Sequence, residues 1–277
     1  MPVPTLTDLP IRYLEIALSV DRDDFPSCNY LNFASYLRLF AITGLADTYE
    51  KILYLDSDIY MARPGLERMF EIDLPLNKGV AAVRDLPQQW NLTERLHEAI
   101  ELDLPSSPYF NSGVLLVLTR EWREQRVFER CLAQIKKYPQ ALIHTDQSAL
   151  NLALDGDWAE LSWIWNMYCN PGSAWVVKRI PAVLVHFAGG TKPWMEGRNH
   201  FPKHIVAWYA DFLMTHYQET LAPAPPRPPR NTARKRKWKP KIIRYTRNAR
   251  LNYDIFMKLR PYRARLRGDM GVLGPRK

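Results

Sequence analysis

Short apolar runs of strand length alternate with helical patterns along the chain, and this alternation permits few architectures. The apolar runs are IRYLEIAL (11–18), KILYL (51–55), GVAAV (79–83), GVLLVL (113–118) and AVLVHF (182–187). Between residues 121 and 137, apolar side chains recur on one helical face at spacings of three and four, at Phe128, Cys131, Leu132 and Ile135. Alternating strands and helices predict an α/β fold built on a mainly parallel sheet.

Charge divides the chain into an acidic body and a strongly basic tail. Residues 221–277 hold 18 Lys and Arg but only two acids, a net charge of +16. The whole chain carries +9, so residues 1–220 carry −7. The junction LAPAPPRPPR is dense in proline, which favours extended backbone and cannot continue a helix. We therefore predict a globular domain over residues 1–222, a proline-rich linker over 223–230 and a basic tail over 231–277.

Several classes of protein are disfavoured by simpler features. The chain has no run of 18 apolar residues, which argues against a membrane-spanning helix. The first ten residues, MPVPTLTDLP, lack the basic head and apolar stretch of a signal peptide. The three cysteines are far apart and have no metal-like spacing. We expect reduced thiols in a cytosolic protein.

Two carboxylates follow the apolar run KILYL, at Asp56 and Asp58, with only Ser57 between them. Ligands of open α/β sheets bind at the carboxyl ends of strands, where this pair would lie. Two like charges so close together repel, and a divalent cation would relieve the repulsion. Hard oxygen ligands suit Mg²⁺ or Mn²⁺, which usually also bind phosphates. The acids could instead cap the following turn, and dehalogenase-type phosphatases also place a D-x-D after an apolar strand.

Three further segments carry polar residues in positions suited to a ligand. YFNSGVLLVL (109–118) places Asn111 and two small residues before an apolar run, so that backbone can approach a ligand closely. HTDQSALNLALDG (144–156) predicts a helix with Thr145 as N-cap and Gly156 beyond its end. Its first turn would hold an acid and an amide at the positive end of the helix dipole. HFAGGTKPW (186–194) combines a histidine, a glycine pair and a lysine, as a phosphate-binding turn would.

Five segments, in this order, resemble glycosyltransferase family 8, the retaining enzymes that use UDP-sugars. They are SYLRLF (35–40), ILYLDSDI (52–59), YFNSGVLLV (109–117), HTDQSALN (144–151) and HFAGGTKPW (186–194). The resemblance spans residues 10–215 and is closest to the bacterial lipopolysaccharide galactosyl- and glucosyltransferases. The third segment has Ser112 where the family usually has alanine. The resemblance implies the GT-A fold, a Rossmann-like nucleotide-binding sheet, for the globular domain.

The resemblance also implies roles for individual residues around a metal and a diphosphate. Asp56, Asp58 and His186 would bind Mn²⁺, with Mg²⁺ as the alternative. Lys192 and the backbone near Gly189 would hold the phosphates. Arg38 would reach the diphosphate or the donor sugar. Ser57 belongs to the same donor site through its place in the motif.

The remaining implied roles concern the sugar. The residues expected around it are Asp85, Asn111, Ser112, Gly113, Asp146 and Gln147. Gln147 matches the position below the anomeric carbon, and we expect it to stabilise an oxocarbenium-like ion, because an amide is a poor nucleophile. Structural alternatives are a packed histidine at 186, a turn at Asn111 and a helix-cap partner at Asp146.

The start of the chain departs from the family pattern. Family members begin with a strand and a loop close to A-A-D-D-N-Y, and this chain has none. Residues 11–26 resemble a later strand of the family instead. We expect an N-terminally incomplete sheet, caused either by a start codon placed too late or by loss of donor binding in a remnant enzyme. Intact downstream motifs favour the first explanation.

The basic tail also contains apolar residues at helical spacing, at Leu251, Ile255, Phe256 and Leu259. A basic amphipathic segment is typical of attachment to anionic lipid. A nucleic acid is the rival partner and a solvated tail the plain alternative. Together with the resemblance, these features predict a peripheral enzyme on the cytoplasmic face of the membrane. It would move galactose or glucose from UDP to a glycan or lipid-linked acceptor, in lipopolysaccharide or other surface polysaccharide synthesis, without binding nucleic acid.

Overall fold

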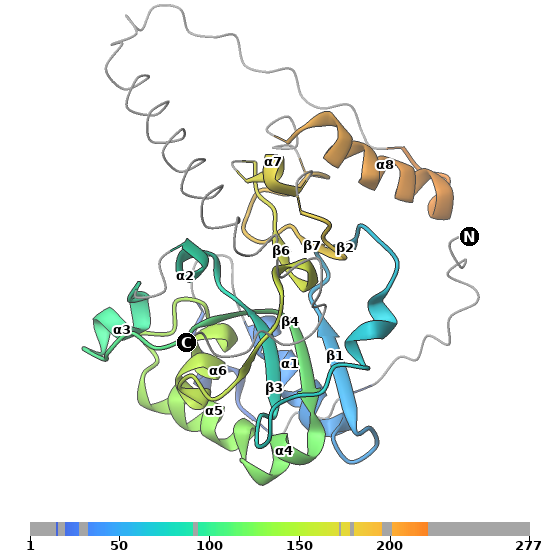
Figure 1. Ribbon diagram of the computed structural model, residues 1–277. Coiled ribbons are helices and arrows are strands. Elements are labelled where there is room, and N and C mark those ends of the chain that lie inside the picture. Colours follow the sequence, from blue (N-terminus) through green and yellow to red (C-terminus); the bar gives the residue numbers. More distant parts are fainter. Residues whose placement is uncertain are drawn as a thin grey trace, which may run out of the picture.

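The computed structural model of the 277-residue chain describes Glu15 and residues 20–27, 33–90, 94–171, 173–177, 180–195 and 201–220. Its centre is a four-stranded sheet in the order β1-β4-β3-β5 (Figure 1). The strands are β1 (Lys51–Leu55), β3 (Val80–Arg84), β4 (Phe110–Leu118) and β5 (Ala159–Glu160). Three of the apolar runs predicted as strands, at residues 51–55, 79–83 and 113–118, therefore form this sheet.

The directions of these strands are mixed. β4 runs antiparallel to both β1 and β3, whereas β5 runs parallel to β3. Three of the four strands consequently point the same way, and β4 is the exception. The predicted α/β architecture is confirmed, with β4 adding antiparallel ladders at the middle of the sheet.

Both faces of the sheet are buried, because residues of β3 alternate between two apolar clusters. Val80 and Ala82 face one cluster, and Ala81 and Val83 face the other. The first cluster is covered by helices, which are α1 (Leu37–Leu45), α4 (Thr119–Glu124), α5 (Val127–Lys137) and α6 (Asp146–Leu154). β1 ends the sheet within the described residues, and all five of its residues are only half-buried, although most of them are apolar.

The second cluster is covered by a smaller sheet and a long helix. The smaller sheet has the order β2-β7-β6, with β2 (Ile59–Met61), β7 (Leu184–His186) and β6 (Met167–Tyr168). α8 (Lys203–Tyr217) packs on it through buried Ile205 and through Trp208, whose ring stacks on Tyr60 at 4.9 Å. The apolar run at 182–187 thus forms a strand, but in this second sheet (Figure 1).

Short elements complete the described fold. They are α2 (Leu86–Trp90), α3 (His97–Glu101), α7 (Ala174–Val177) and the 3₁₀ helices η2 (Arg22–Asp24), η3 (Phe33–Tyr36), η4 (Leu66–Met69) and η5 (Trp163–Trp165). α2 and α3 lie between β3 and β4 in the chain.

Of the two helices predicted from the sequence, one is divided in the structure and the other forms where it was predicted. The pattern over 121–137 forms two helices rather than one, because the chain breaks at Arg126, whose φ of 52° is left-handed. Cys131 and Ile135 are buried on the predicted face. The helix predicted after Thr145 begins at Asp146 and ends at Leu154, before Gly156. Thr145 holds the N-cap position, but its side chain does not cap the helix.

Other predictions concern cysteines and the chain ends. Cys131 and Cys169 are free thiols, as predicted, and both are buried, whereas Cys28 lies outside the described residues. The predicted linker at 223–230, the tail at 231–277 and the strand at 11–18, apart from Glu15, also lie outside them. None of the helices in the described ranges has the length and apolarity needed to cross a membrane.

Candidate active site

The site begins where β4 separates from its neighbours. On one side, Leu55 still pairs with Val114, and the Asp56 amide donates to the Gly113 carbonyl at 2.8 Å. On the other side, the pairing with β3 jumps from Leu115 to Asn111. Residues 112–114 therefore bulge away from β3. Asn111 and the two small residues after it lie inside β4, rather than before it as the sequence suggests, and the bulge turns their backbone toward the site.

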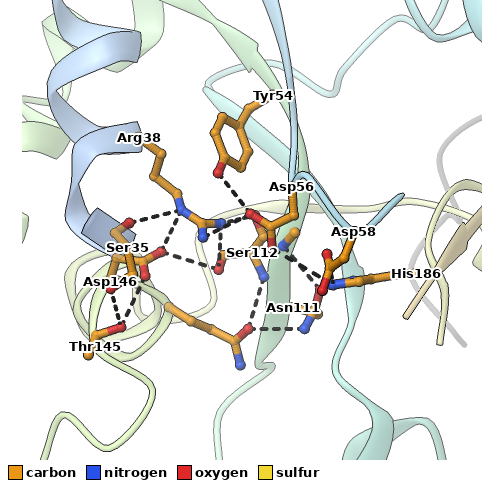
Figure 2. A network of polar contacts seen from close by, with 12 residues as sticks. Ser35, Arg38, Tyr54, Asp56, Asp58, Asn111, Ser112, Thr145, Asp146 and His186 are labelled. Atoms are coloured by element: carbon orange, nitrogen blue, oxygen red, sulfur yellow. Dashed lines mark hydrogen bonds and ion pairs between the residues drawn. The ribbon is translucent and has the colours of Figure 1, made fainter. Parts of the chain in front are cut away.

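Three residues at this edge could hold a metal ion. Asp56 and Asp58 lie on the turn between β1 and β2, and His186 ends β7 (Figure 2). The pairing of Ile59 with His186 brings the histidine beside the turn. One ligand atom from each of the three lies within 4.8 Å of the others. His186 Nε2 is 3.1 Å from Asp58 Oδ1 and 3.8 Å from Asp56 Oδ2.

Two further observations fit a cation in this position. Asp58 Oδ1 is buried, and its 3.1 Å contact with His186 Nε2 lacks the geometry of a hydrogen bond, so a cation would satisfy this oxygen. Gly113 leaves the required room, because a Cβ there would lie 2.7 Å from His186 Nδ1 and 2.9 Å from Asp56 Oδ2. Two carboxylates and an imidazole suit Mn²⁺, and the oxygen ligands also suit Mg²⁺.

The lysine predicted to hold phosphate lies against one of these carboxylates. Lys192 Nζ contacts the Asp58 carboxylate and donates to the Phe187 carbonyl at 2.7 Å. Burial alone would raise the pKa of Asp58, but His186 and Lys192 lower it to about 2. Gly189 has φ of 92°, a conformation that a side chain would strain. Ser57 is exposed on the turn between the two acids.

Arg38 links Asp56, a possible metal ligand, to Asp146, which is predicted to lie beside the sugar. Its Nη2 is 3.0 Å from Asp56 Oδ1 and its Nε is 2.8 Å from Asp146 Oδ2 (Figure 2). Its Nη1 donates to the Ser112 carbonyl at 2.6 Å. Burial would lower the pKa of Arg38, but Asp146 and Asp56 raise it, so the guanidinium stays charged. Protein groups thus occupy most of its donors, and contact with a diphosphate or sugar stays a prediction.

The residues predicted to surround the sugar include two amides and two acids. Gln147 Oε1 accepts hydrogen bonds from Asn111 Nδ2 and from the Ser112 amide, both at 3.1 Å. Asn111 Nδ2 is also 3.4 Å from Asp85 Oδ1. Burial raises the pKa of Asp85 and of Asp146, and Arg38 counteracts the rise at Asp146. One connected network therefore contains the predicted residues, except that Ser57 and Gly189 lie beside it.

Sequence reasoning missed several members of this network. Tyr54 donates to Asp56 Oδ1 at 2.8 Å, and its position two residues before Asp56 on a strand could have indicated a shared face. Burial raises the pKa of Tyr54 further above its ordinary value, so the phenol stays protonated. Asn166 bonds to both Asn111 and His186, and nothing in its local sequence, WIWNMY, marks it.

Buried polar groups outside the site connect the two segments that carry Asn111 and Gln147, which are the beginning of β4 and the first turns of α6. Asn151 on α6 accepts from the Phe110 amide at 2.8 Å and donates to the Phe110 and Gln147 carbonyls at 2.9 Å. Glu98 on α3 accepts from the Tyr109 hydroxyl at 3.0 Å and contacts the Ser148 hydroxyl. These bonds tie the beginning of β4 to the first turns of α6, which carry Asn111 and Gln147.

Comparison with known proteins assigns the chain to a family. The sequence model of the family described as Glycosyl transferase family 8 matches residues 7–197, more than half of the chain. The chain belongs to glycosyltransferase family 8. Membership in this family removes the D-x-D phosphatase from consideration, and the motif resemblance in the sequence is confirmed.

Curated relatives of this family 8 glycosyltransferase include enzymes of lipopolysaccharide synthesis. Lipopolysaccharide 1,2-glucosyltransferase of Escherichia coli K12 is 30% identical over 172 residues, which is 58% of this chain and 49% of the relative. Lipopolysaccharide 1,3-galactosyltransferase of Salmonella typhimurium LT2 is 26% identical over 178 residues, or 61% and 51%. General stress protein A of Bacillus subtilis 168 is 29% identical over 207 residues, or 69% of each chain. The matched region thus spans about half the length of the two named transferases.

Among solved structures, the family 8 fold is matched by the galactosyltransferase LgtC in complex with donor and acceptor sugar analogs. The TM-score is 0.54 at 21% identity, and the match covers 80% of this chain and 77% of LgtC. Similarity at that level of identity shows the fold. The predicted GT-A fold is therefore confirmed.

Proposed function

We propose that this glycosyltransferase moves a hexose, galactose or glucose, from a UDP-sugar to a glycan acceptor with retention of anomeric configuration. The observation that carries the proposal is the continuity of the site: the possible metal ligands Asp56, Asp58 and His186 adjoin the buried Asp146–Gln147 pair through Arg38 and Asn111. The kinship to lipopolysaccharide glucosyl- and galactosyltransferases supports the choice of hexose and a role in lipopolysaccharide or other surface polysaccharide synthesis.

The metal-side residues would act on the diphosphate. Asp56, Asp58 and His186 would hold Mn²⁺, or Mg²⁺ in its place, and the ion would supply positive charge that stabilises a departing nucleotide diphosphate. Lys192 lies beside Asp58, so its ammonium can pass from that carboxylate to a phosphate oxygen. The left-handed turn at Gly189 would let backbone approach the same phosphates.

The sugar-side residues would orient the ring and stabilise developing positive charge. Gln147 Oε1 already accepts two hydrogen bonds, which engage both lone pairs of its carbonyl oxygen. This engagement disfavours nucleophilic attack by Gln147 and favours electrostatic stabilisation of an oxocarbenium-like ion. Asp146, paired with Arg38 and hydrogen-bonded by Ser112 and Thr145, would hold sugar hydroxyls together with Asp85.

The proposal is tested by incubating the full chain with UDP-galactose or UDP-glucose, Mn²⁺ and a lipopolysaccharide-type acceptor. We expect UDP release with one of the two donors, an α-linked product by proton NMR, loss of turnover in EDTA and recovery on adding Mn²⁺. Full turnover in EDTA would contradict the metal assignment. Absence of turnover and of donor binding with every UDP-hexose would support the remnant enzyme instead.

We further propose that residues 231–277 attach the enzyme to the anionic cytoplasmic face of the membrane, beside a lipid-linked acceptor. The charge of +16 on residues 221–277 supports this, because each Lys or Arg near an anionic surface contributes about 1 kcal/mol. No nucleic-acid partner is expected. The 1–222 catalytic domain and the 223–230 linker remain predictions.

Deletion of residues 223–277 is expected to release the protein from vesicles containing anionic lipid while leaving UDP-sugar hydrolysis unchanged. Every proposed site residue precedes Met195, so the catalytic groups are retained. Vesicle co-sedimentation at low and high salt measures attachment, which screening should weaken over a Debye length of about 10 Å at 0.1 M. Equal sedimentation of the full and shortened chains would show that the tail does not anchor the enzyme.

A further inference from the structure

Two backbone amides fix the orientation of two side-chain amides in the site. The Gly113 amide donates to Asn111 Oδ1 at 3.1 Å, and the Ser112 amide donates to Gln147 Oε1 at 3.1 Å. A backbone N–H can only donate, so each contact identifies the oxygen of the side-chain amide that it reaches. Asn111 Nδ2 must then point away from Gly113, and it donates to Gln147 Oε1.

The same reasoning extends to Asn166 and the histidine. Because Asn111 presents its oxygen to Asn166, the group 2.9 Å away must be the Asn166 Nδ2 donor. Asn166 therefore presents Oδ1, an acceptor, to His186 Nδ1 at 3.0 Å. The imidazole must therefore carry a proton on Nδ1. Nε2 is then the ring nitrogen left for a cation, and it faces Asp58 Oδ1 and Asp56 Oδ2, with which it can share a proton while no cation is bound.

We propose that Asn166 is a positioning residue that joins the metal ligand to the sugar-side amides. It sets the tautomer of His186 in which Nε2 can bind a cation, and it holds Asn111 in the orientation that donates to Gln147. Asn166 is 3% exposed, so bulk water cannot replace either partner. Its consequence for catalysis rests on the proposed metal-dependent transfer, whereas its effect on His186 does not.

The arrangement couples two parts of the site that lie far apart in the sequence. A cation at Nε2 makes the imidazole a stronger donor at Nδ1, which strengthens the bond to Asn166. That bond favours the amide orientation in which Asn166 donates to Asn111. Binding of a divalent ion therefore supports the geometry of Asn111 and Gln147, and the coupling is reciprocal.

Asn166→Asp separates the two contacts, because a carboxylate still accepts from His186 but can no longer donate to Asn111. We expect the Kd for Mn²⁺, measured by calorimetry, to stay within about threefold of the original protein, since a carboxylate is a common partner of a metal-bound histidine. We expect kcat to fall about tenfold or more, with a smaller change in KM for the donor. Asn166→Leu removes both contacts, and we expect it to weaken Mn²⁺ binding about 10–100-fold as well.

Asn170→Asp is the matched control. It makes the same chemical change four residues along the chain, where Asn170 Oδ1 accepts from the Ser173 amide at 2.9 Å, a bond that aspartate retains. Both Kd and kcat should remain within about twofold. A parallel fall of metal affinity and kcat in Asn166→Asp, or no change in either, would overturn the proposal.

A measurement on the unaltered protein covers the case in which the variants do not fold. Nitrogen-15 NMR of labelled histidine, with His186 assigned through His186→Gln, should show the proton on Nδ1 in the metal-free protein. An Nδ1 without a proton, or absence of Mn²⁺ binding by the original protein, would overturn the inference. If the original protein binds Mn²⁺ but turns over no UDP-hexose, the proposed function fails while the tautomer and the Kd values still decide the role of Asn166.

Discussion

Asp58→Asn is expected to lower metal-dependent transfer on the order of 10³-fold while the protein still folds. Asn has the shape of Asp but lacks its negative charge, with which His186, Lys192 and a divalent ion would interact at this position. Asp58 lies on the turn after β1 rather than in either apolar cluster, so the sheet does not depend on it. Steady-state kinetics across a range of Mn²⁺ concentrations measures the loss.

The cost of Asp58→Asn in stability should depend on pH. The folded-state pKa of Asp58, about 2, lies below its ordinary value of 3.8. A depressed carboxylate stabilises the folded state above its ordinary pKa, and this contribution is lost as pH falls toward the folded-state value. In metal-free protein, the difference in Tm between the original and the variant should therefore be present at pH 7 and shrink between pH 4 and 2.

Asp47→Asn provides the control for this prediction. Asp47 is exposed and pairs with Arg123 on the surface, where an ion pair contributes at most about 1 kcal/mol. We expect its activity to match that of the original protein. If Asp58→Asn kept more than a tenth of the original activity at saturating Mn²⁺, Asp58 would not be a metal ligand.

Gly113→Ala is expected to be nearly as damaging, through geometry alone. The added methyl would lie 2.7 Å from His186 Nδ1 and 2.9 Å from Asp56 Oδ2, so at least one of these groups must move. Overpacking of this kind costs about 1–3 kcal/mol. Because the displaced atoms belong to possible metal ligands, we expect Mn²⁺ affinity to fall about 10–100-fold, measured by calorimetry, and transfer to fall with it.

Gly44→Ala is the matched substitution for Gly113→Ala. Gly44 lies in α1, and a Cβ there would meet nothing within 4 Å. Alanine is favoured over glycine in a helix by about 0.5–1 kcal/mol, so this variant should be slightly more stable and fully active. Unchanged metal binding in Gly113→Ala would mean that the ligand cluster tolerates a side chain at 113 and is looser than described.

Local sequence patterns were sufficient to predict where many helices and strands lie and which residues are candidates for binding or catalysis. The apolar runs at 51–55, 79–83 and 113–118 form strands, because the sheet that they build packs against an apolar cluster on each face. The helix that starts after Thr145 ends before Gly156, as predicted, because the ends of a helix depend on residues that are adjacent in the sequence. The order of the motifs also pointed to family 8, because Asp56, Asn111, Gln147 and His186 stand in recognisable local contexts.

Only the tertiary structure decided how these pieces combine. It reversed β4 relative to its neighbours, split the helix pattern at Arg126 and engaged Arg38 with protein groups. It also brought Asn166 to Asn111 across 55 residues of chain, and Arg38 to Ser112 across 74. A hydrogen-bond partner is chosen by distance in space and by the direction of donors and acceptors. The periodicity of a sequence indicates only which face of an element a residue occupies. The role of a buried asparagine that orients a metal ligand therefore cannot be predicted from the residues next to it in the sequence.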